Sequence, residues 1–171
     1  MRPSNVFLTA GTALLVLLAG CKPAAIQQAE HNKQVFLQSI DAINNKNFEA
    51  LNDLGLVNFV RHCQATPDVK VNSLEDFKNY LRQDSATFPD SRITIDHVVA
   101  EGNFVAFYGT YVGTQKGSMG PFPPSNRQMS VEIAGVQRFD NGKVAEMWVT
   151  WDNLTALIQL GHFPLPKQTS K

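Results

Sequence analysis

The hydrophobic pattern of this 171-residue chain changes its period near Pro89, and that change limits the fold more than any other feature. Before Pro89, apolar residues recur every three to four positions, as in amphipathic helices. After it they alternate with polar residues, as in half-buried strands. Helices are predicted over residues 25–45, 47–53, 56–62 and 73–88, and strands over residues 92–99, 104–115, 128–139 and 144–151. Helices followed by a run of antiparallel strands predict an α+β fold, with the helices on one face of a curved sheet.

Local signals support these boundaries. Ser73 is followed three residues later by Asp76, which is close to a capping box at the start of a helix. Asn141 and Gly142 form the dipeptide most typical of a two-residue hairpin, between the last two strands. A short closing helix is predicted over residues 153–160, with Gly161 as its C-terminal cap.

The first twenty residues are expected to be a targeting segment rather than part of the fold. Arg2 is the only charged residue before Cys21, and residues 6–19 form an uncharged run. That run is shorter than the ~20 residues needed to cross a bilayer, but suits the apolar core of a secretory leader. It ends in Leu-Ala-Gly followed by Cys21, which resembles a bacterial lipobox. An uncleaved anchor helix is the alternative.

This resemblance implies a lipid-anchored protein of the cell envelope. Cys21 would become the lipidated first residue of the mature chain, and diacyl anchoring holds a protein firmly to a membrane. Lys22 follows it where an acidic residue would signal inner-membrane retention, so the outer membrane, facing the periplasm, is expected. The predicted organisation is a leader at 1–20, a tether and helix start at 21–34, one domain at 35–162 and a tail at 163–171.

Composition excludes several function classes. Lys plus Arg and Asp plus Glu both number 15, so the basic excess of a nucleic-acid-binding protein is missing. With Cys21 assigned to lipid, Cys63 has no partner for a disulfide, and a small buried residue is expected there. The four histidines are dispersed without the paired spacing of a metal site. No metal site is predicted.

Asp152 is the leading candidate for acid–base chemistry. It ends the last predicted strand, just after Trp148 and Trp151, and partial desolvation by two indoles would raise its pKa. Glu146, Trp148 and Thr150 share its strand phase, so this polar set is expected to face a pocket. The alternative is that Asp152 only caps the helix that follows.

Histidine and aromatic residues supply the other candidates. His62 ends an apolar segment predicted as helical, and either assists Asp152 or serves a structural role. His97 falls in the apolar phase of its strand and is expected to be packed. Tyr108, Trp148 and Trp151 are candidate substrate-binding residues, although aromatic side chains at this density usually belong to a core.

Taken together, the segments resemble the SnoaL-like polyketide cyclases, or ester cyclases, of the nuclear transport factor 2-like superfamily. Their order and spacing agree over roughly residues 35–161. The matching stretches are residues 58–62, 88–90, 100–103, 113–117, 123–127, 141–148, 151–152 and 159–161.

The resemblance implies a cone-shaped α+β barrel with a deep pocket, usually dimeric through its sheet. It also implies a carboxylate at Asp152 that removes an activated α-proton from a polyketide ester, without a cofactor, so that the enolate closes a ring. A homodimer that binds a small apolar ligand is therefore expected.

Two positions depart from the family pattern. Family members commonly carry histidine where this chain has Gln115 and Met147. Gln115 can still hydrogen-bond an oxyanion, so it is a candidate substrate-binding residue, but it cannot shuttle a proton. Met147 can only pack. The catalytic set is thereby reduced to Asp152 and His62, and the competing hypothesis is a non-catalytic protein that binds a small ligand or a partner.

Overall fold

The computed structural model describes residues 23–163, so the predicted leader, Cys21 and nearly all of the predicted tail lie outside the described residues. The helices are α1 (Ala24–Asn44), the 3-10 helix η1 (Phe48–Ala50), α2 (Leu51–Leu54), α3 (Leu74–Thr87) and α4 (Asn153–Leu160). The strands are β1 (Gly55–Cys63), β2 (Arg92–Glu101), β3 (Phe104–Thr114), β4 (Gln128–Asp140) and β5 (Lys143–Trp151). Within this range, no helix combines the length and the apolar character needed to span a bilayer.

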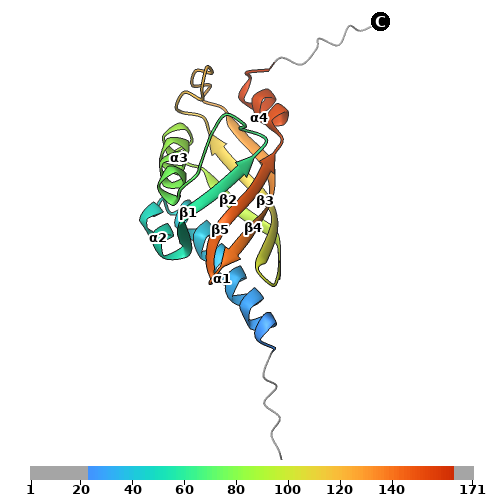
Figure 1. Cartoon of the computed structure of the whole chain (residues 1–171). Helices are drawn as coiled ribbons and strands as arrows, with labels where there is room; N and C mark the ends of the chain where they lie inside the picture. Colours follow the sequence, from blue (N-terminus) through green and yellow to red (C-terminus); the bar gives the residue numbers. More distant parts are fainter. Residues whose placement is uncertain (1–22, 164–171) are drawn as a thin grey trace, which may run out of the picture.

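The five strands form one curved sheet in the order β1-β5-β4-β3-β2. Strands β2 to β5 are an antiparallel meander, whereas β1 joins the edge of β5 in parallel. Helices α1 and α3 cover one face of the sheet, and α4 lies at the end opposite to the start of α1 (Figure 1). The predicted α+β class is confirmed, with β1 and β2 as the free edges of an unclosed sheet.

The core lies between the two long helices and the concave face of the sheet. Phe36 of α1 is fully buried, and its ring stacks on that of Phe107 in β3 with centroids 5.0 Å apart. Phe59 of β1 meets Phe77 of α3 with centroids 4.9 Å apart. These contacts attach α1 and α3 to different parts of the sheet.

The prediction of a helix over residues 56–62 is wrong, because this segment lies in strand β1. Phe59 and Arg61 are 2% and 6% exposed and alternate with more exposed neighbours, which is the two-residue period of a strand. The backbone partners of β1 come from β5, far away in the sequence, with His62 opposite Trp148. Such non-local pairing overrides a weak local helical pattern.

The turn and cap signals are confirmed. The Ser73 hydroxyl accepts a hydrogen bond from the Asp76 amide at 3.0 Å, which starts α3. Asn141 and Gly142 both have positive φ, at 49° and 77°, as a two-residue hairpin turn between β4 and β5 requires. Gly161 ends α4 with a φ of 79°.

A β-bulge separates the two halves of β2. The pairing with β3 shifts between Ile95 and His97, so that Ile95 lies opposite Gly109 and His97 opposite Tyr108. The extra residue reverses the side-chain phase. His97 is therefore exposed, and the expectation that it packs in the core is wrong.

Candidate functional site

A cavity of about 920 Å³ lies between the helices and the concave face of the sheet. Most of its lining is apolar and comes from α1, α3 and all five strands, including Ile40, Phe77, Ile93, Val131, Ile133, Met147 and Val149. Segments 65–69 and 118–122, together with Leu157 of α4, line it as well. A cavity of this size suits a compact organic molecule, and the few polar groups in its wall will decide how such a molecule is oriented.

Asp84 and Tyr111 form a hydrogen-bonded pair in the cavity wall. Asp84 belongs to the inward face of α3, one turn after Tyr80, and Tyr111 comes from β3. The Tyr111 hydroxyl donates to Asp84 Oδ2 at 2.9 Å. Burial raises the pKa of Asp84, although the Tyr111 hydrogen bond and the charges of Lys46 and Arg61 act in the opposite direction. Burial and the charge of Asp84 also raise the pKa of Tyr111, which therefore stays a neutral donor.

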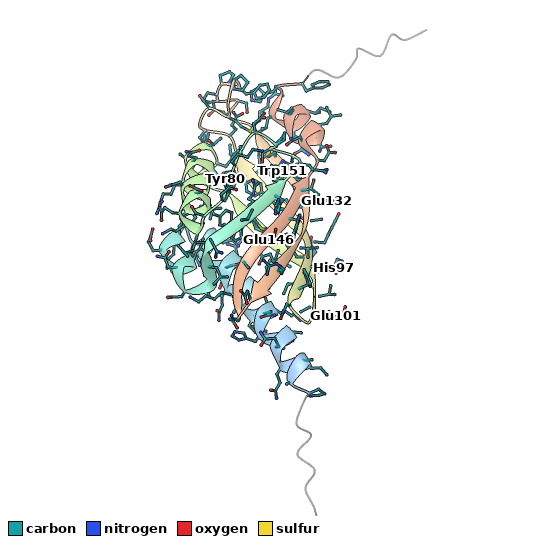
Figure 2. All side chains as sticks on the ribbon, viewed as in Figure 1. Tyr80, His97, Glu101, Glu132, Glu146 and Trp151 are labelled. Atoms are coloured by element: carbon teal, nitrogen blue, oxygen red, sulfur yellow. The ribbon has the colours of Figure 1, made fainter. Side chains whose placement is uncertain are left out.

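Arg61 lies in the same wall, between two aromatic rings. Its guanidinium carbon is 4.5 Å from the centroid of the Tyr80 ring and 5.7 Å from that of Trp151. Figure 2 labels Tyr80 on α3 and Trp151 at the end of β5, and both residues line the cavity. Burial raises the pKa of Tyr80 to about 12, so its phenol is neutral at physiological pH.

Gln137 and Lys46 are also among the polar residues that line the cavity. Gln137 of β4 donates from Nε2 to the Met147 sulfur at 3.5 Å, while its buried Oε1 has no partner. Lys46, just after α1, donates to the carbonyl and the hydroxyl of Ser91, and burial lowers its pKa. Within residues 23–163, no group of three or more His, Cys, Asp or Glu side chains is arranged to hold a metal ion.

The structure places Asp152 outside this cavity, as the N-cap of α4. The Thr155 amide donates to Asp152 Oδ1 at 3.0 Å, and the Thr155 hydroxyl donates to Oδ2 at 2.6 Å. These bonds lower the pKa of Asp152, so the predicted upward shift is wrong and the capping alternative is confirmed.

The strand phase explains the displacement of Asp152. The cavity is lined by Met147, Val149 and Trp151 of β5, whereas Trp148 is 40% exposed on the other face. The expectation that the polar set of β5 faces the pocket is therefore wrong. Successive residues of a strand point to opposite faces, so the phase that includes Asp152 points away from the cavity.

The other predicted site residues are separated from one another. His62 lies on the outer face, where Nε2 donates to Glu146 at 2.8 Å and its ring stacks on Trp148 at 5.2 Å. Tyr108 is 38% exposed on that same outer face. Gln115 is fully buried but outside the cavity lining. Of the six residues predicted to act on a substrate, only Trp151 lines the cavity.

Gln115 holds a loop rather than a ligand. Its Nε2 donates to the carbonyl oxygens of Gly117 and Pro123 at 3.2 and 3.1 Å, and its Oε1 accepts from His162 at 2.7 Å. The bond to Pro123 attaches the proline-rich segment between β3 and β4 to the end of β3, and the bond from His162 attaches it to the residues after α4. The segment in turn supplies part of the cavity lining, so Gln115 affects the site through the shape of the loop.

Arg61, Asp84, Tyr111 and Gln137 are not among the predicted site residues, although the sequence carries a signal for three of them. Asp84 lies four residues after Tyr80, in phase with the apolar stripe of its helix, where a carboxylate is unexpected. Arg61 and Gln137 likewise occupy inward phases of their strands, beside Phe59 and Phe139. A polar residue in an apolar phase is the informative exception.

The profile of one protein family, described as SnoaL-like polyketide cyclase, matches residues 33–160. Among solved structures, TsrD from Streptomyces laurentii is 24% identical, with 78% of this chain and 97% of that chain covered and a TM-score of 0.71. IdmH, a candidate polyketide cyclase from Streptomyces antibioticus, is 26% identical over 76% and 98% of the two chains, with a TM-score of 0.68.

A SnoaL-like polyketide cyclase from Agrobacterium tumefaciens is 21% identical over 76% of this chain and 98% of that chain, with a TM-score of 0.63. A comparison with curated proteins finds no match. The family profile covers most of the chain, including every strand, α3 and α4. This chain therefore belongs to the SnoaL-like polyketide cyclase family.

Proposed function

We propose that this chain is a cofactor-free acid–base catalyst of the cyclase or isomerase type that acts on a small, largely apolar carbonyl compound or ester. The observation that carries the proposal is the Asp84–Tyr111 pair in the wall of a largely apolar cavity. A carboxyl group whose pKa is raised by burial is better matched to proton transfer near neutral pH than an exposed one.

In the proposed reaction, the Asp84 carboxylate removes a proton from the carbon beside the substrate carbonyl, and the C–H electron pair forms an enolate. Once Asp84 is protonated, the Tyr111 hydroxyl is free to donate to the enolate oxygen. In a cyclisation, the enolate carbon attacks a second carbonyl of the same molecule, and Asp84 returns the proton to the new alkoxide. In an isomerisation, the proton returns to a different carbon.

The test is α-proton exchange of 2-tetralone in D₂O, followed by proton NMR at a concentration that saturates the cavity. The wild-type protein should accelerate the exchange, and Asp84→Asn should lower that acceleration at least ~100-fold. Asp152→Asn is the matched control, because it makes the same change outside the cavity and asparagine remains a good cap. An active Asp84→Asn variant would overturn the proposed role of Asp84, and loss of activity in Asp152→Asn alone would assign the acid–base role to Asp152.

Non-catalytic binding of a small ligand is the second candidate function. It is favoured by the roles of the two residues that replace the histidines common in the family. Gln115 holds a loop, and Met147 packs in the cavity wall beside Gln137, so neither transfers a proton. Saturable binding of 2-tetralone without any acceleration of its exchange would support this function over catalysis.

We propose that the protein acts at the cell envelope, held by lipid on Cys21 in the outer membrane and facing the periplasm. The support is the leader-like run that ends at Cys21, followed by Lys22. The full chain expressed in a Gram-negative bacterium should carry acyl chains on Cys21 by mass spectrometry and partition into the detergent phase. Cys21→Ser should abolish both properties, and an unmodified Cys21 in the wild type would contradict the proposal.

We propose in addition that two copies pair through the outer face of the sheet. Phe104, Tyr108, Val136 and Trp148 are 36–48% exposed there, which is an unusual gathering of large apolar side chains. Light scattering should give a dimer for the wild type and a monomer for Val136→Glu. Val57→Glu is the control, because Val57 is also an exposed valine but belongs to β1. This variant should remain dimeric. A wild-type monomer at micromolar concentration would overturn this assignment.

A further inference from the structure

Lys46 brings an amine to the wall of the cavity from an unusual backbone position. It lies two residues after the end of α1 and is part of the cavity lining. Its amide donates to the Ile43 carbonyl oxygen and its φ is 58°, so it occupies the left-handed cap position after the helix. Glycine or asparagine is usual there, because other residues adopt a left-handed backbone at a cost. The end of the helix therefore does not account for a lysine at this position.

One residue, Ser91, holds the amine of Lys46. Nζ donates to the Ser91 carbonyl oxygen at 3.0 Å and to the Ser91 hydroxyl at 2.6 Å. Ser91 is buried and lines the cavity as well. A lysine nitrogen has three positions besides its bond to carbon, and Ser91 takes two of them. Within residues 23–163 the third position has neither a hydrogen-bond partner nor an ion pair, and the space that both residues line is the cavity.

The surroundings of Lys46 favour the neutral, nucleophilic form of the amine. Burial lowers the pKa of Lys46, although the charges of Asp84 and Asp90 act in the opposite direction. Lysines in apolar sites with a lowered pKa are the ones that attack carbonyl groups. Most of the cavity lining is apolar, so a carbonyl compound that enters it meets this amine away from bulk water.

The amine is also connected to the acid–base pair of the cavity. Burial and the charge of Asp84 raise the pKa of Tyr111, and a hydrogen bond with the Ser91 side chain acts in the opposite direction. The Tyr111 hydroxyl in turn donates to Asp84. Lys46, Ser91, Tyr111 and Asp84 thus form a row of polar side chains that line one cavity. Hydroxyl and carboxyl groups in this row can exchange protons with a molecule bound at the amine.

We propose that Lys46 forms a covalent imine with a small apolar ketone or aldehyde in the cavity. The neutral amine adds to the carbonyl carbon, a C–N bond forms, and the carbonyl π electrons move to the oxygen, which takes a proton. After a second protonation the oxygen leaves as water with the C–O electron pair, and the nitrogen lone pair completes the C=N bond. Overall, a charged lysine and a carbonyl compound give a protonated imine and one water, without an oxidant or a reductant. This inference rests on the cavity of the proposed function, but not on proton removal by Asp84.

The test is reductive trapping with 2-tetralone and sodium cyanoborohydride in mildly alkaline buffer, with the modified lysine identified by peptide mass spectrometry. The wild type should carry at least ~10-fold more adduct on Lys46 than on any other lysine, because binding concentrates the ketone beside it. Lys46→Met should lose this adduct. Lys70→Met is the matched control and should keep it. Lys70 also donates to a backbone carbonyl oxygen, that of Pro67 at 2.9 Å, but it is exposed and outside the cavity lining.

An adduct spread evenly over the lysines of the wild type would overturn the proposal even if Lys46→Met fails to fold. So would an equal total amount of adduct in Lys46→Met and the wild type. Trapping needs no removal of a proton from carbon. Labelling of Lys46 without Asp84-dependent exchange would therefore count against the proposed function alone. Asp84-dependent exchange without labelling of Lys46 would count against this inference alone.

Discussion

Replacing Tyr111 by phenylalanine should raise the pKa of Asp84 further and shift the pH dependence of catalysis. The phenol donates to Asp84 Oδ2 at 2.9 Å, and no other side chain in the described range donates a hydrogen bond to this carboxyl. A hydrogen bond to a carboxylate favours its ionised form, so loss of the bond favours the protonated form. The substitution removes one oxygen and keeps the ring that packs against Phe88.

The size of the shift follows from the strength of the bond. A hydrogen bond to a charged group contributes about 1.5–3 kcal/mol. At about 1.4 kcal/mol per pKa unit, its loss corresponds to an upward shift of about 1–2 units. Because Asp84 lines the cavity, water can replace part of the interaction, and the lower end of that range is expected.

Two measurements check this prediction. The rate of 2-tetralone exchange should fall on the acid side as Asp84 becomes protonated, and this limb should move about one pH unit higher in Tyr111→Phe. Carbon NMR of the aspartate carboxyl groups should report the same shift without reference to activity. Tyr108→Phe is the matched control, because Tyr108 lies on the outer face and makes no contact with Asp84.

An acid limb that stays in place in Tyr111→Phe would refute the reasoning, because the hydrogen bond would then have no influence on proton transfer. An equal shift in Tyr108→Phe would also refute it, since the effect would not be local. A carboxyl titration that moves while the rate profile does not would show that the pair is coupled but that Asp84 is not the base.

Three further predictions concern stability. Because the pKa of Asp84 is raised in the folded state, the folded protein loses stability as pH rises from 3.8 through that pKa. Asp84→Asn should therefore be more resistant to urea than the wild type at pH 7, and this difference in stability should vanish below pH 3.8. The lowered pKa of Asp152 has the opposite sign, so Asp152→Ala should lower Tm at pH 7, with the difference narrowing as pH falls below 3.8. Phe36→Ala should cost about 3–5 kcal/mol of unfolding free energy, because the side chain is fully buried against Phe107.

Much of the fold could be predicted because the signals that define it are local. The antiparallel strands are joined in sequence order, and the turn at Asn141 and Gly142 fixes the first pairs of β4 and β5, before the register shift between Arg138 and Phe139. Strand β1 could not be predicted in this way, because its backbone partner is β5 and the pairing is parallel. The alternation of Phe59 and Arg61 with their neighbours is too short to identify a strand without that partner.

The candidate site depends on strand phase, which the sequence leaves open. A shift of one residue moves every side chain of a strand to the other face. The indole pair and the carboxylate near the end of β5 therefore suggested a pocket, whereas the structure places Trp148 outside and Trp151 inside. The pairing of β1 with β5 does not determine which face of the sheet Trp148 and Trp151 point to. The position of the helices relative to the sheet decides it.

The polar groups of the cavity argue for a ligand rather than for stability. Arg61, Asp84, Tyr111 and Gln137 come from four different elements and converge on one cavity whose lining is mostly apolar. A chain selected only for a stable core would fill these inward phases with apolar residues, because buried polar groups without complete partners are costly. Arg61 makes one long side-chain hydrogen bond and the buried Gln137 Oε1 makes none, so among the described residues the cavity wall keeps polar groups whose partners are incomplete.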